Sequence, residues 1–89
     1  MVWAINVDDK TFKDLQKLDK PIAERIINFI ENTLAIAENP ISLGAALQSS
    51  DLGDFWKYRV GDYRIIASID DVQVTILIVK IGNRKEVYR

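Results

Sequence analysis

Hydrophobic and polar residues alternate through residues 55–66, FWKYRVGDYRII, on either side of the pair Gly61-Asp62. Alternation with a period of two predicts two β-strands. Glycine at the first central position suits a two-residue type II′ hairpin turn, because glycine takes the required positive φ at little steric cost. The register that this turn sets pairs Val60 with Tyr63, Arg59 with Arg64, Tyr58 with Ile65 and Lys57 with Ile66.

The two faces of this predicted hairpin differ in chemical character. One face is apolar and is expected to be buried; it carries Trp56, Tyr58, Val60, Tyr63, Ile65 and Ala67. The opposite face carries the cations Lys57, Arg59 and Arg64, and Arg59 lies directly across from Arg64, where like charges are destabilising. Solvated side chains that discourage edge pairing are one explanation of this face. We favour the other explanation, a site for an anionic ligand.

The first 40 residues show a short apolar run followed by helical spacing. Residues 2–7, VWAINV, predict a strand, and a first helix is expected over about residues 9–18. Pro21 suits the first turn of a second helix, which the pair Asn39-Pro40 ends. The residues expected on the inner faces of the helices are Phe12, Leu15 and Leu18 in the first, and Ile22, Ile26, Phe29, Ile30, Thr33 and Ala37 in the second.

The second half of the chain begins with a connector and continues with strands. Residues 41–54 have no clean period, so we expect at most a short helical turn there and assign these residues no chemistry. Strands are expected at about residues 55–60, 63–69 and 72–81. The order predicts a single α+β domain over residues 1–89: an N-terminal strand, a two-helix hairpin and a three-stranded antiparallel meander, with both helices packed on one face of the sheet.

The turn between the last two strands decides which side chains share the cationic face. A two-residue Asp70-Asp71 turn pairs Ile69 with Val72. The buried face then gains Val72, Val74, Ile76 and Ile78, and the face of Arg64 gains Gln73, Thr75, Leu77, Val79 and Ile81, with Leu77 beside Arg64.

Composition excludes several classes of function. The chain has no cysteine and no histidine, which removes disulfides, thiol chemistry and a serine triad, and it has neither of the glycine-rich phosphate-loop motifs. The carboxylates are scattered, so we expect no metal and no cofactor. No apolar run reaches about 18 residues and the N-terminus lacks a basic start, so we expect no membrane span and a cytoplasmic protein.

Charge is distributed unevenly along the chain. The net charge of −1 hides a balance of −4 over residues 1–54, with five Lys/Arg and nine Asp/Glu, and of +3 over residues 55–89, with seven and four. The charged surface of the second helix, Arg25 included, is expected to be solvated. Arg84, Tyr88 and Arg89 of the tail GNRKEVYR can return to the cationic face of the hairpin. Charge of this kind suggests an anionic partner for the second half.

A set of Arg, Lys and Tyr side chains supports one kind of chemistry particularly well. Arginine binds phosphate through two parallel hydrogen bonds and stabilises the charge added in a phosphorane transition state. RNA supplies its own nucleophile, the 2′-hydroxyl, so positioned Lys, Arg and Tyr groups can promote cleavage of a phosphodiester without a metal. Tyr88 could also stack on a base.

The stretches WKYRVGDYRII and IGNRKEVYR resemble the RelE family of toxins within the RelE/ParE toxin–antitoxin superfamily, and the resemblance covers essentially the whole chain. It implies a RelE-like, microbial RNase-like fold and a ribosome-dependent mRNA endoribonuclease that cuts in the A site without a metal. The implied partners are the ribosome and mRNA, a RelB-like antitoxin that inhibits the toxin, and operator DNA bound only through the antitoxin complex.

The resemblance also implies roles for individual residues. The catalytic set is Lys57, Arg59, Arg64, Arg84 and Tyr88: the first two take part in proton transfer and phosphate contact, Arg64 and Arg84 stabilise the transition state, and Tyr88 orients the messenger base. The RNA-binding set is Lys57, Arg59, Arg64, Lys80, Arg84, Lys85 and Arg89. Because arginine stays protonated, Lys57 or Tyr88 is left to move protons.

Two other functions remain open at this point. A ParE-like toxin would keep the fold but inhibit DNA gyrase by binding it. A catalytically degenerate toxin would act only in a complex that represses its own operon. The presence of all five residues of the catalytic set favours the nuclease.

Overall fold

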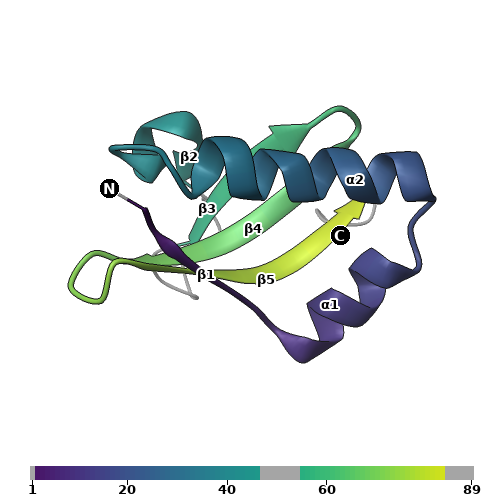
Figure 1. The fold of residues 1–89 in the computed structure, drawn as a ribbon, viewed down its shortest axis with the longest axis horizontal. Helices are drawn as coiled ribbons and strands as arrows, with labels where there is room; N and C mark the ends of the chain where they lie inside the picture. The colour runs from purple at the N-terminus through teal and green to yellow at the C-terminus, as the bar shows by residue number, and fades with distance from the viewer. Residues whose placement is uncertain (1, 47–54, 84–89) are drawn as a thin grey trace.

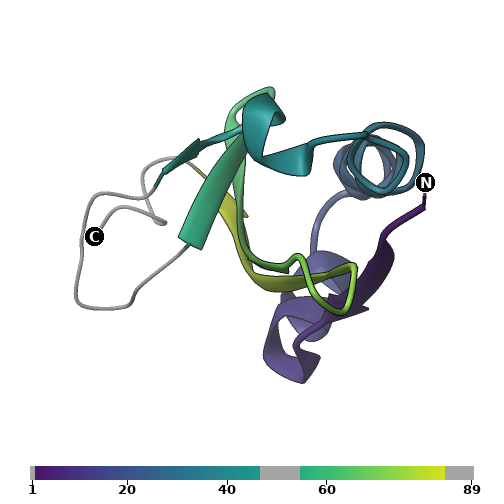
Figure 2. The same ribbon diagram turned by 90° about the vertical axis from the view of Figure 1, so that its left-hand side faces the viewer.

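The computed structural model describes residues 2–46 and 55–83, which form a five-stranded sheet with helices on one face (Figure 1, Figure 2). The elements are β1 (Ala4–Val7), α1 (Asp9–Gln16), α2 (Lys20–Phe29), η1 (Ile30–Leu34), η2 (Pro40–Leu43), β2 (Ala45–Ala46), β3 (Phe55–Val60), β4 (Tyr63–Asp70) and β5 (Thr75–Asn83). The strand order is β1-β5-β4-β3-β2, with β1 parallel to β5 and the other pairs antiparallel. The predicted α+β arrangement is confirmed.

The hairpin of β3 and β4 has the predicted register. Val60 pairs with Tyr63 and Arg59 with Arg64, and the pairing continues in step to Phe55 and Ser68. Gly61 has a φ of +59°, and Asp62 is not among the described residues with positive φ, as a type II′ turn requires. The predicted hairpin is therefore confirmed, and with it the separation of its two faces.

The connection between β4 and β5 differs from the prediction. It is a four-residue turn over residues 71–74, and Asp70 pairs with Thr75. The Oδ1 atom of Asp70 accepts hydrogen bonds from the backbone N–H groups of Val72 and Gln73, at 3.0 and 3.1 Å. This side-chain bonding to the following backbone competes with a tight two-residue turn. The predicted pairing of Ile69 with Val72 is wrong.

A β-bulge lies farther along the same pair of strands. Ile66 pairs with Lys80 and Ala67 pairs with Ile78, so Val79 is an extra residue on β5. The bulge reverses the alternation beyond it. Ile81, predicted on the cationic face, is instead in the core with 5% exposure. Lys80 pairs with Ile66 and lies on the cationic face, and Gly82 pairs with Arg64 at the place predicted for Leu77.

The bulge also determines which side of α1 is buried. The hydroxyl of Thr11 donates a hydrogen bond of 2.8 Å to the carbonyl of Val79. Thr11 is accordingly buried at 2% exposure, whereas Phe12 is 49% exposed. The prediction that Phe12 faces the core is wrong, and the reason is that a carbonyl at the bulge needs a donor that a phenyl ring cannot supply. Leu15 is buried as predicted.

The second helix changes its winding before its predicted end. The α-helical bonds of α2 give way to the π-helical turn η1, in which the Ala35 N–H bonds to the Ile30 carbonyl at 2.9 Å. Leu34 is fully buried there and Thr33 is exposed, the reverse of the predicted face. The helix does not run on to Asn39-Pro40.

The core lies between the helices and the apolar face of the sheet. Its fully or almost fully buried members include Ile26, Leu34, Tyr58, Ile65, Ala67, Ile76 and Ile78. Trp3 is buried as well, and its indole N–H donates to the carbonyl of Ala37 at 3.1 Å. Trp56, Val60 and Tyr63 are partly buried against this core, as predicted. Within the described residues, no helix is long and apolar enough to cross a membrane.

The connector after the helices is more ordered than predicted. It forms the 3-10 helix η2 and the two-residue strand β2, in which Ala45 pairs with Lys57 and Ala46 with Trp56. The Asn39 side chain accepts from the Ile41 N–H at 3.2 Å and so caps η2. Residues 47–54 of the connector lie outside the described part of the chain.

Candidate functional site

The predicted cations line one pocket, which is formed by η2, β2, β3 and β4. The pocket has a volume of about 300 Å³ and is lined by Leu43, Gly44, Ala45, Lys57, Tyr58, Arg59 and Arg64. The alternation of β3 and β4 puts Lys57, Arg59 and Arg64 on one face of the hairpin, and the type II′ turn sets Arg59 opposite Arg64. The structure therefore brings together three of the residues predicted from the sequence.

The three cations differ in their contact with solvent. Arg59 is exposed, Lys57 is intermediate and Arg64 is only 7% exposed. The Nη1 of Arg64 donates to the carbonyl of Tyr63 at 3.3 Å. A guanidinium loses hydration when it is buried, and a second positive charge across the strand pair adds repulsion. An anion in the pocket would offset both costs.

An apolar wall stands beside the cationic floor, and sequence reasoning assigned it no chemistry. It consists of Leu43, Gly44 and Ala45, and we call these three residues the shelf. A Cβ atom at Gly44 would lie 2.7 Å from the carbonyl oxygen of Lys57 and 2.8 Å from the Cε1 of Tyr58. Only glycine permits this approach of η2 to β3. A single glycine before two alanines was the one signal of it in the sequence.

Tyr58 joins the shelf to the floor of the pocket. Its hydroxyl donates to the carbonyl of Pro40 at 2.7 Å, and both residues are buried. Burial raises the pKa of Tyr58 to about 12 from its usual value of 10.0. The hydroxyl is thus neutral at physiological pH and acts as a hydrogen-bond donor that holds η2 against the sheet.

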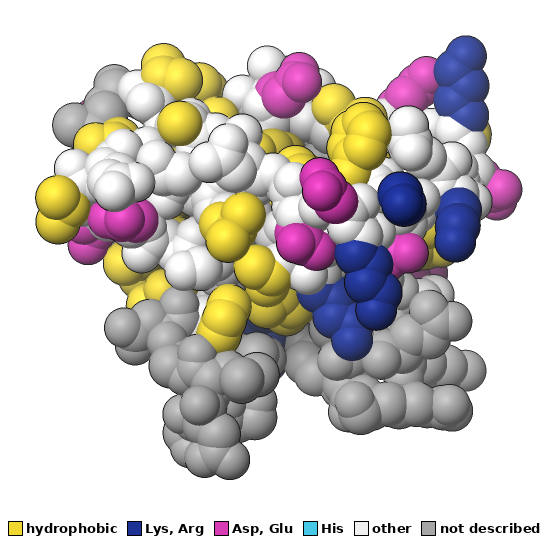
Figure 3. Space-filling view, turned by 90° about the horizontal axis from the view of Figure 1, so that it is seen from below, with side chains coloured by type: hydrophobic (Ala, Val, Ile, Leu, Met, Phe, Trp, Pro, Cys, Tyr) yellow, Lys and Arg dark blue, Asp and Glu magenta, His cyan; other side chains and the backbone are white. Residues whose placement is uncertain are grey.

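Lys80, predicted to bind RNA, lies apart from this pocket. Its register places it on the cationic face, but it lines a separate pocket of about 490 Å³ at the end of β5, together with Asp14, Lys17 and Asn83 among others. On the surface seen from below, Lys and Arg side chains gather on the right half with Asp and Glu side chains beside them (Figure 3). Asp14 and Lys17 line the same pocket as Lys80, so the charge around Lys80 is mixed.

The predicted tail residues cannot be placed on this site. Arg84, Lys85, Tyr88 and Arg89 lie outside the described residues, so their roles stay predictions.

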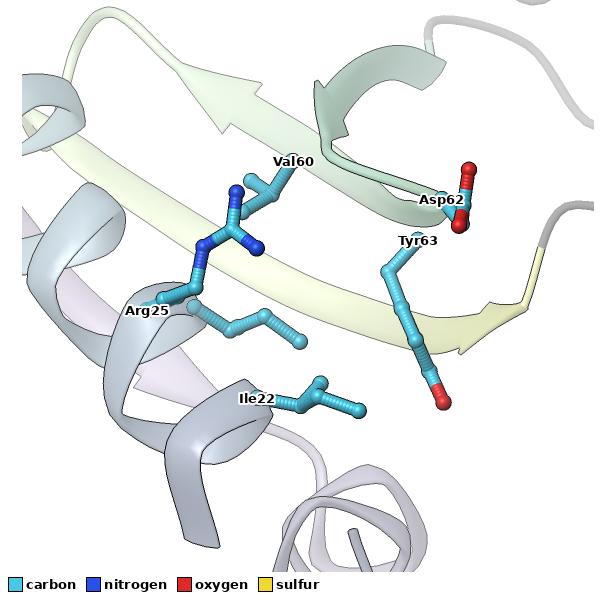
Figure 4. A pocket seen from close by; sticks show the side chains of 6 residues that line it. Ile22, Arg25, Val60, Asp62 and Tyr63 are labelled. Carbon is cyan, nitrogen blue, oxygen red and sulfur yellow. The ribbon is translucent and has the colours of Figure 1, made fainter. Parts of the chain in front are cut away.

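Arg25 is exposed as predicted, but it also contacts the hairpin. Its guanidinium nitrogen Nη2 lies 3.4 Å from the position that a Cβ at Gly61 would take. Arg25 and Ile22 of α2 face Val60 and Tyr63 across a pocket of about 160 Å³ (Figure 4). This pocket lies between α2 and the hairpin, so Arg25 is near the hairpin but does not line the pocket of the three cations.

The arrangement suits the binding of a phosphodiester. Two arginines and one lysine line one pocket. A guanidinium group can form paired hydrogen bonds to phosphate oxygens. In the described part of the chain, no three acidic side chains lie close enough together to hold a metal ion.

Comparison with known proteins defines the class. A family model described as the ParE toxin of the type II toxin-antitoxin system, parDE, matches residues 5–88, so the chain belongs to the type II toxins of the RelE/ParE superfamily. Toxin RelE of Mycobacterium tuberculosis is 36% identical over 77 residues, covering 86% of this chain and 76% of the relative. Toxin RelG of the same organism is 28% identical over 89 residues, covering 100% of this chain and 99% of the relative. The chain belongs to the RelE family within the RelE/ParE superfamily.

Solved structures agree with this assignment. The toxin-antitoxin complex RelBE2 from Mycobacterium tuberculosis matches with a TM-score of 0.84 at 24% identity, covering 97% of this chain and 95% of that chain. The archaeal RelE-RelB complex from Pyrococcus horikoshii matches with a TM-score of 0.76 at 26% identity, covering 97% of this chain and 99% of that chain. The chain therefore has the fold of RelE toxins.

Proposed function

We propose that this toxin is a ribosome-dependent endoribonuclease that cuts translated mRNA in the A site. The observation that carries the proposal is the single pocket lined by Lys57, Arg59 and Arg64. Membership of the RelE family supports it. Three cations around a pocket of about 300 Å³ are matched to a phosphodiester and the groups attached to it.

The proposed reaction uses the 2′-hydroxyl of the messenger as the nucleophile. The 2′-oxygen bonds to the adjacent phosphorus, and the bond from phosphorus to the 5′-oxygen breaks. One proton leaves the 2′-hydroxyl and one proton reaches the departing 5′-oxygen. The products are a 2′,3′-cyclic phosphate and a 5′-hydroxyl, and the step requires no metal. The protein must align the reacting atoms and stabilise the negative charge that builds on the phosphate.

Each cation of the pocket has a distinct part in this proposal. Arg64 is held by its bond to the Tyr63 carbonyl, so its guanidinium meets the phosphate with little loss of side-chain entropy. Arg59 is exposed and stabilises the charge of the phosphate from the solvent side. Lys57 is the described residue of the set that can transfer a proton. Arg84 and Tyr88 complete the set by resemblance to the family.

The partners follow from the same proposal. The structures of relatives include complexes of RelE with RelB, and we propose a RelB-like antitoxin for this toxin. An acidic segment of it would neutralise the pocket, and the complex would bind operator DNA through the antitoxin. Leu77 is 40% exposed and available to an apolar part of the antitoxin, but Ile81 is not, because the bulge turns it into the core.

A second candidate function is inhibition of DNA gyrase. The observation that favours it is the description of the matching family model, which names the ParE toxin. A toxin that acts only by binding gyrase needs no cluster of cations around one pocket. The two candidates therefore differ in what they require of Arg59.

The test is primer extension on a defined mRNA after brief expression of wild type, Arg59→Ala or Arg25→Ala. Both arginines are exposed near the hairpin, but only Arg59 lines the pocket, so Arg25→Ala is the matched control. We expect cuts within translated codons for wild type and Arg25→Ala, and a loss of about 100-fold for Arg59→Ala. Arrested growth with falling supercoiling and uncut mRNA would favour gyrase inhibition. Normal growth with all three proteins would favour the degenerate toxin.

A further inference from the structure

The floor and the wall of the pocket differ in chemistry. Its cationic floor suits a phosphate, but the shelf of Leu43, Gly44 and Ala45 carries no charge and offers no side-chain hydrogen bond. At about 300 Å³ the pocket is larger than one phosphate group requires and reaches the size of small-ligand pockets. A ligand that fills it therefore has an anionic part and an apolar part side by side.

Leu43 lines this pocket. It is 46% exposed although it belongs to an ordered 3-10 helix whose neighbour Pro40 is buried. The helix is held in place from several directions. The Ser42 hydroxyl donates to the Asn39 carbonyl at 2.8 Å, and the Tyr58 hydroxyl donates to the Pro40 carbonyl. The exposed leucine thus stands on a fixed support rather than on a loose loop.

A nucleotide has the required pair of parts. Its phosphate is anionic, and its base has an apolar face that side chains such as leucine can cover. We propose that the shelf contacts the base next to the scissile phosphate, and that Leu43 thereby determines in part which nucleotides are cut. This inference rests on the proposed function and adds to it a subsite for the base.

Leu77 shows that exposure alone does not make such a subsite. It is also a leucine, is 40% exposed and lies on the same sheet face as Arg64, as the partner of Ser68. It does not line the pocket of the three cations. Single exposed leucines are common on protein surfaces. What distinguishes Leu43 is that it shares a pocket with Lys57, Arg59 and Arg64.

The experiment combines removal of the leucine with removal of the base. Wild type, Leu43→Ala and Leu77→Ala are each incubated with ribosomes that carry a defined mRNA. The mRNA is either intact or has one abasic nucleotide, placed at each A-site position in turn. At one position, we expect the abasic change to raise the KM of wild type and of Leu77→Ala about fivefold. We expect Leu43→Ala to have a higher KM than wild type on intact mRNA. The abasic change at that position should not raise the KM of Leu43→Ala further, and kcat should be unchanged.

The outcomes separate this inference from the proposed function. If Leu43→Ala cuts with the same KM and codon profile as wild type, the shelf does not contact a base. The same conclusion follows if every abasic nucleotide raises the KM of Leu43→Ala by the same factor as the KM of wild type. If wild type cuts no mRNA on the ribosome, the proposed function fails and the subsite fails with it. A thermal melting curve of Leu43→Ala close to that of wild type is expected, since the residue is half exposed.

Discussion

The two faces of the β3–β4 hairpin are made by the same alternation and have opposite roles. On the helix side, Tyr58, Ile65 and Ala67 are almost completely buried in the core. On the other side, Arg59 and Arg64 are paired across the strands in the floor of one pocket. The first face contributes free energy of folding, and the second carries a repulsion that folding alone does not require. Substitutions on the two faces should therefore separate stability from activity.

The largest expected effect is on the core face. Ile65→Ala removes a fully buried side chain and leaves a cavity, so we expect a loss of about 3 kcal/mol in the free energy of unfolding. Urea denaturation measures it. Val72, which is 92% exposed, provides the control, and Val72→Ala should stay within about 0.5 kcal/mol of wild type. A loss below 1 kcal/mol for Ile65→Ala would contradict the position of the core.

The next effect is on the pocket face. Arg64→Gln keeps a polar side chain but removes the charge and the fork, so we expect kcat for mRNA cleavage to fall about 100-fold. Arg64→Lys keeps the charge but not the planar pair of N–H donors, so its kcat should lie between those of wild type and Arg64→Gln. Single-turnover cleavage on programmed ribosomes measures both. A folded Arg64→Gln protein that keeps half of the wild-type rate would remove Arg64 from the proposed site.

The smallest effect at neutral pH concerns Tyr58, whose ring lies in the core and whose hydroxyl bonds to η2. The folded state raises the pKa of this phenol from 10.0 to about 12, so the folded state holds the proton more tightly. The stability that this contributes is complete below pH 10 and is lost between about pH 10 and 12. The loss amounts to about 2–3 kcal/mol.

Urea denaturation across this pH range distinguishes Tyr58 from the other groups that titrate there. In Tyr58→Phe the Pro40 carbonyl loses its donor, which should cost about 1–2 kcal/mol at pH 7. The decline between pH 10 and 12 should be correspondingly shallower than in wild type. An identical decline in both proteins would show that Tyr58 does not titrate differently in the folded state.

The same comparison explains what could be predicted from the sequence. The register of the β3–β4 hairpin follows from local signals, the glycine of its turn and strict alternation, and it was correct. The register of β5 depends on the Asp70 carboxylate, which bonds to two backbone N–H groups, and on a bulge at Val79. Neither has a signal in the apolar pattern. Ile81 consequently lies on the core face and not on the cationic face where it was predicted.

The candidate site was predictable to the same extent. Its floor comes from the hairpin and was identified by residue type and alternation. Its wall comes from η2 and β2, where the decisive features are a backbone approach at Gly44 and a hydrogen bond across 18 residues from Tyr58 to Pro40. Contacts between distant segments leave no period in the sequence. The shelf could therefore not be predicted from the sequence alone, because it depends on how the connector packs against β3.

The central claim is that the cationic face of the hairpin cuts RNA, and the most direct test uses purified toxin with ribosomes programmed by a defined mRNA. The measurement is the position and the chemical end of each fragment. We expect a cut in the A-site codon with a 2′,3′-cyclic phosphate on one fragment and a 5′-hydroxyl on the other, and this cut should be strongly reduced in Arg59→Ala. Intact mRNA after incubation with the folded wild-type toxin, or equal cutting by Arg59→Ala, would contradict it.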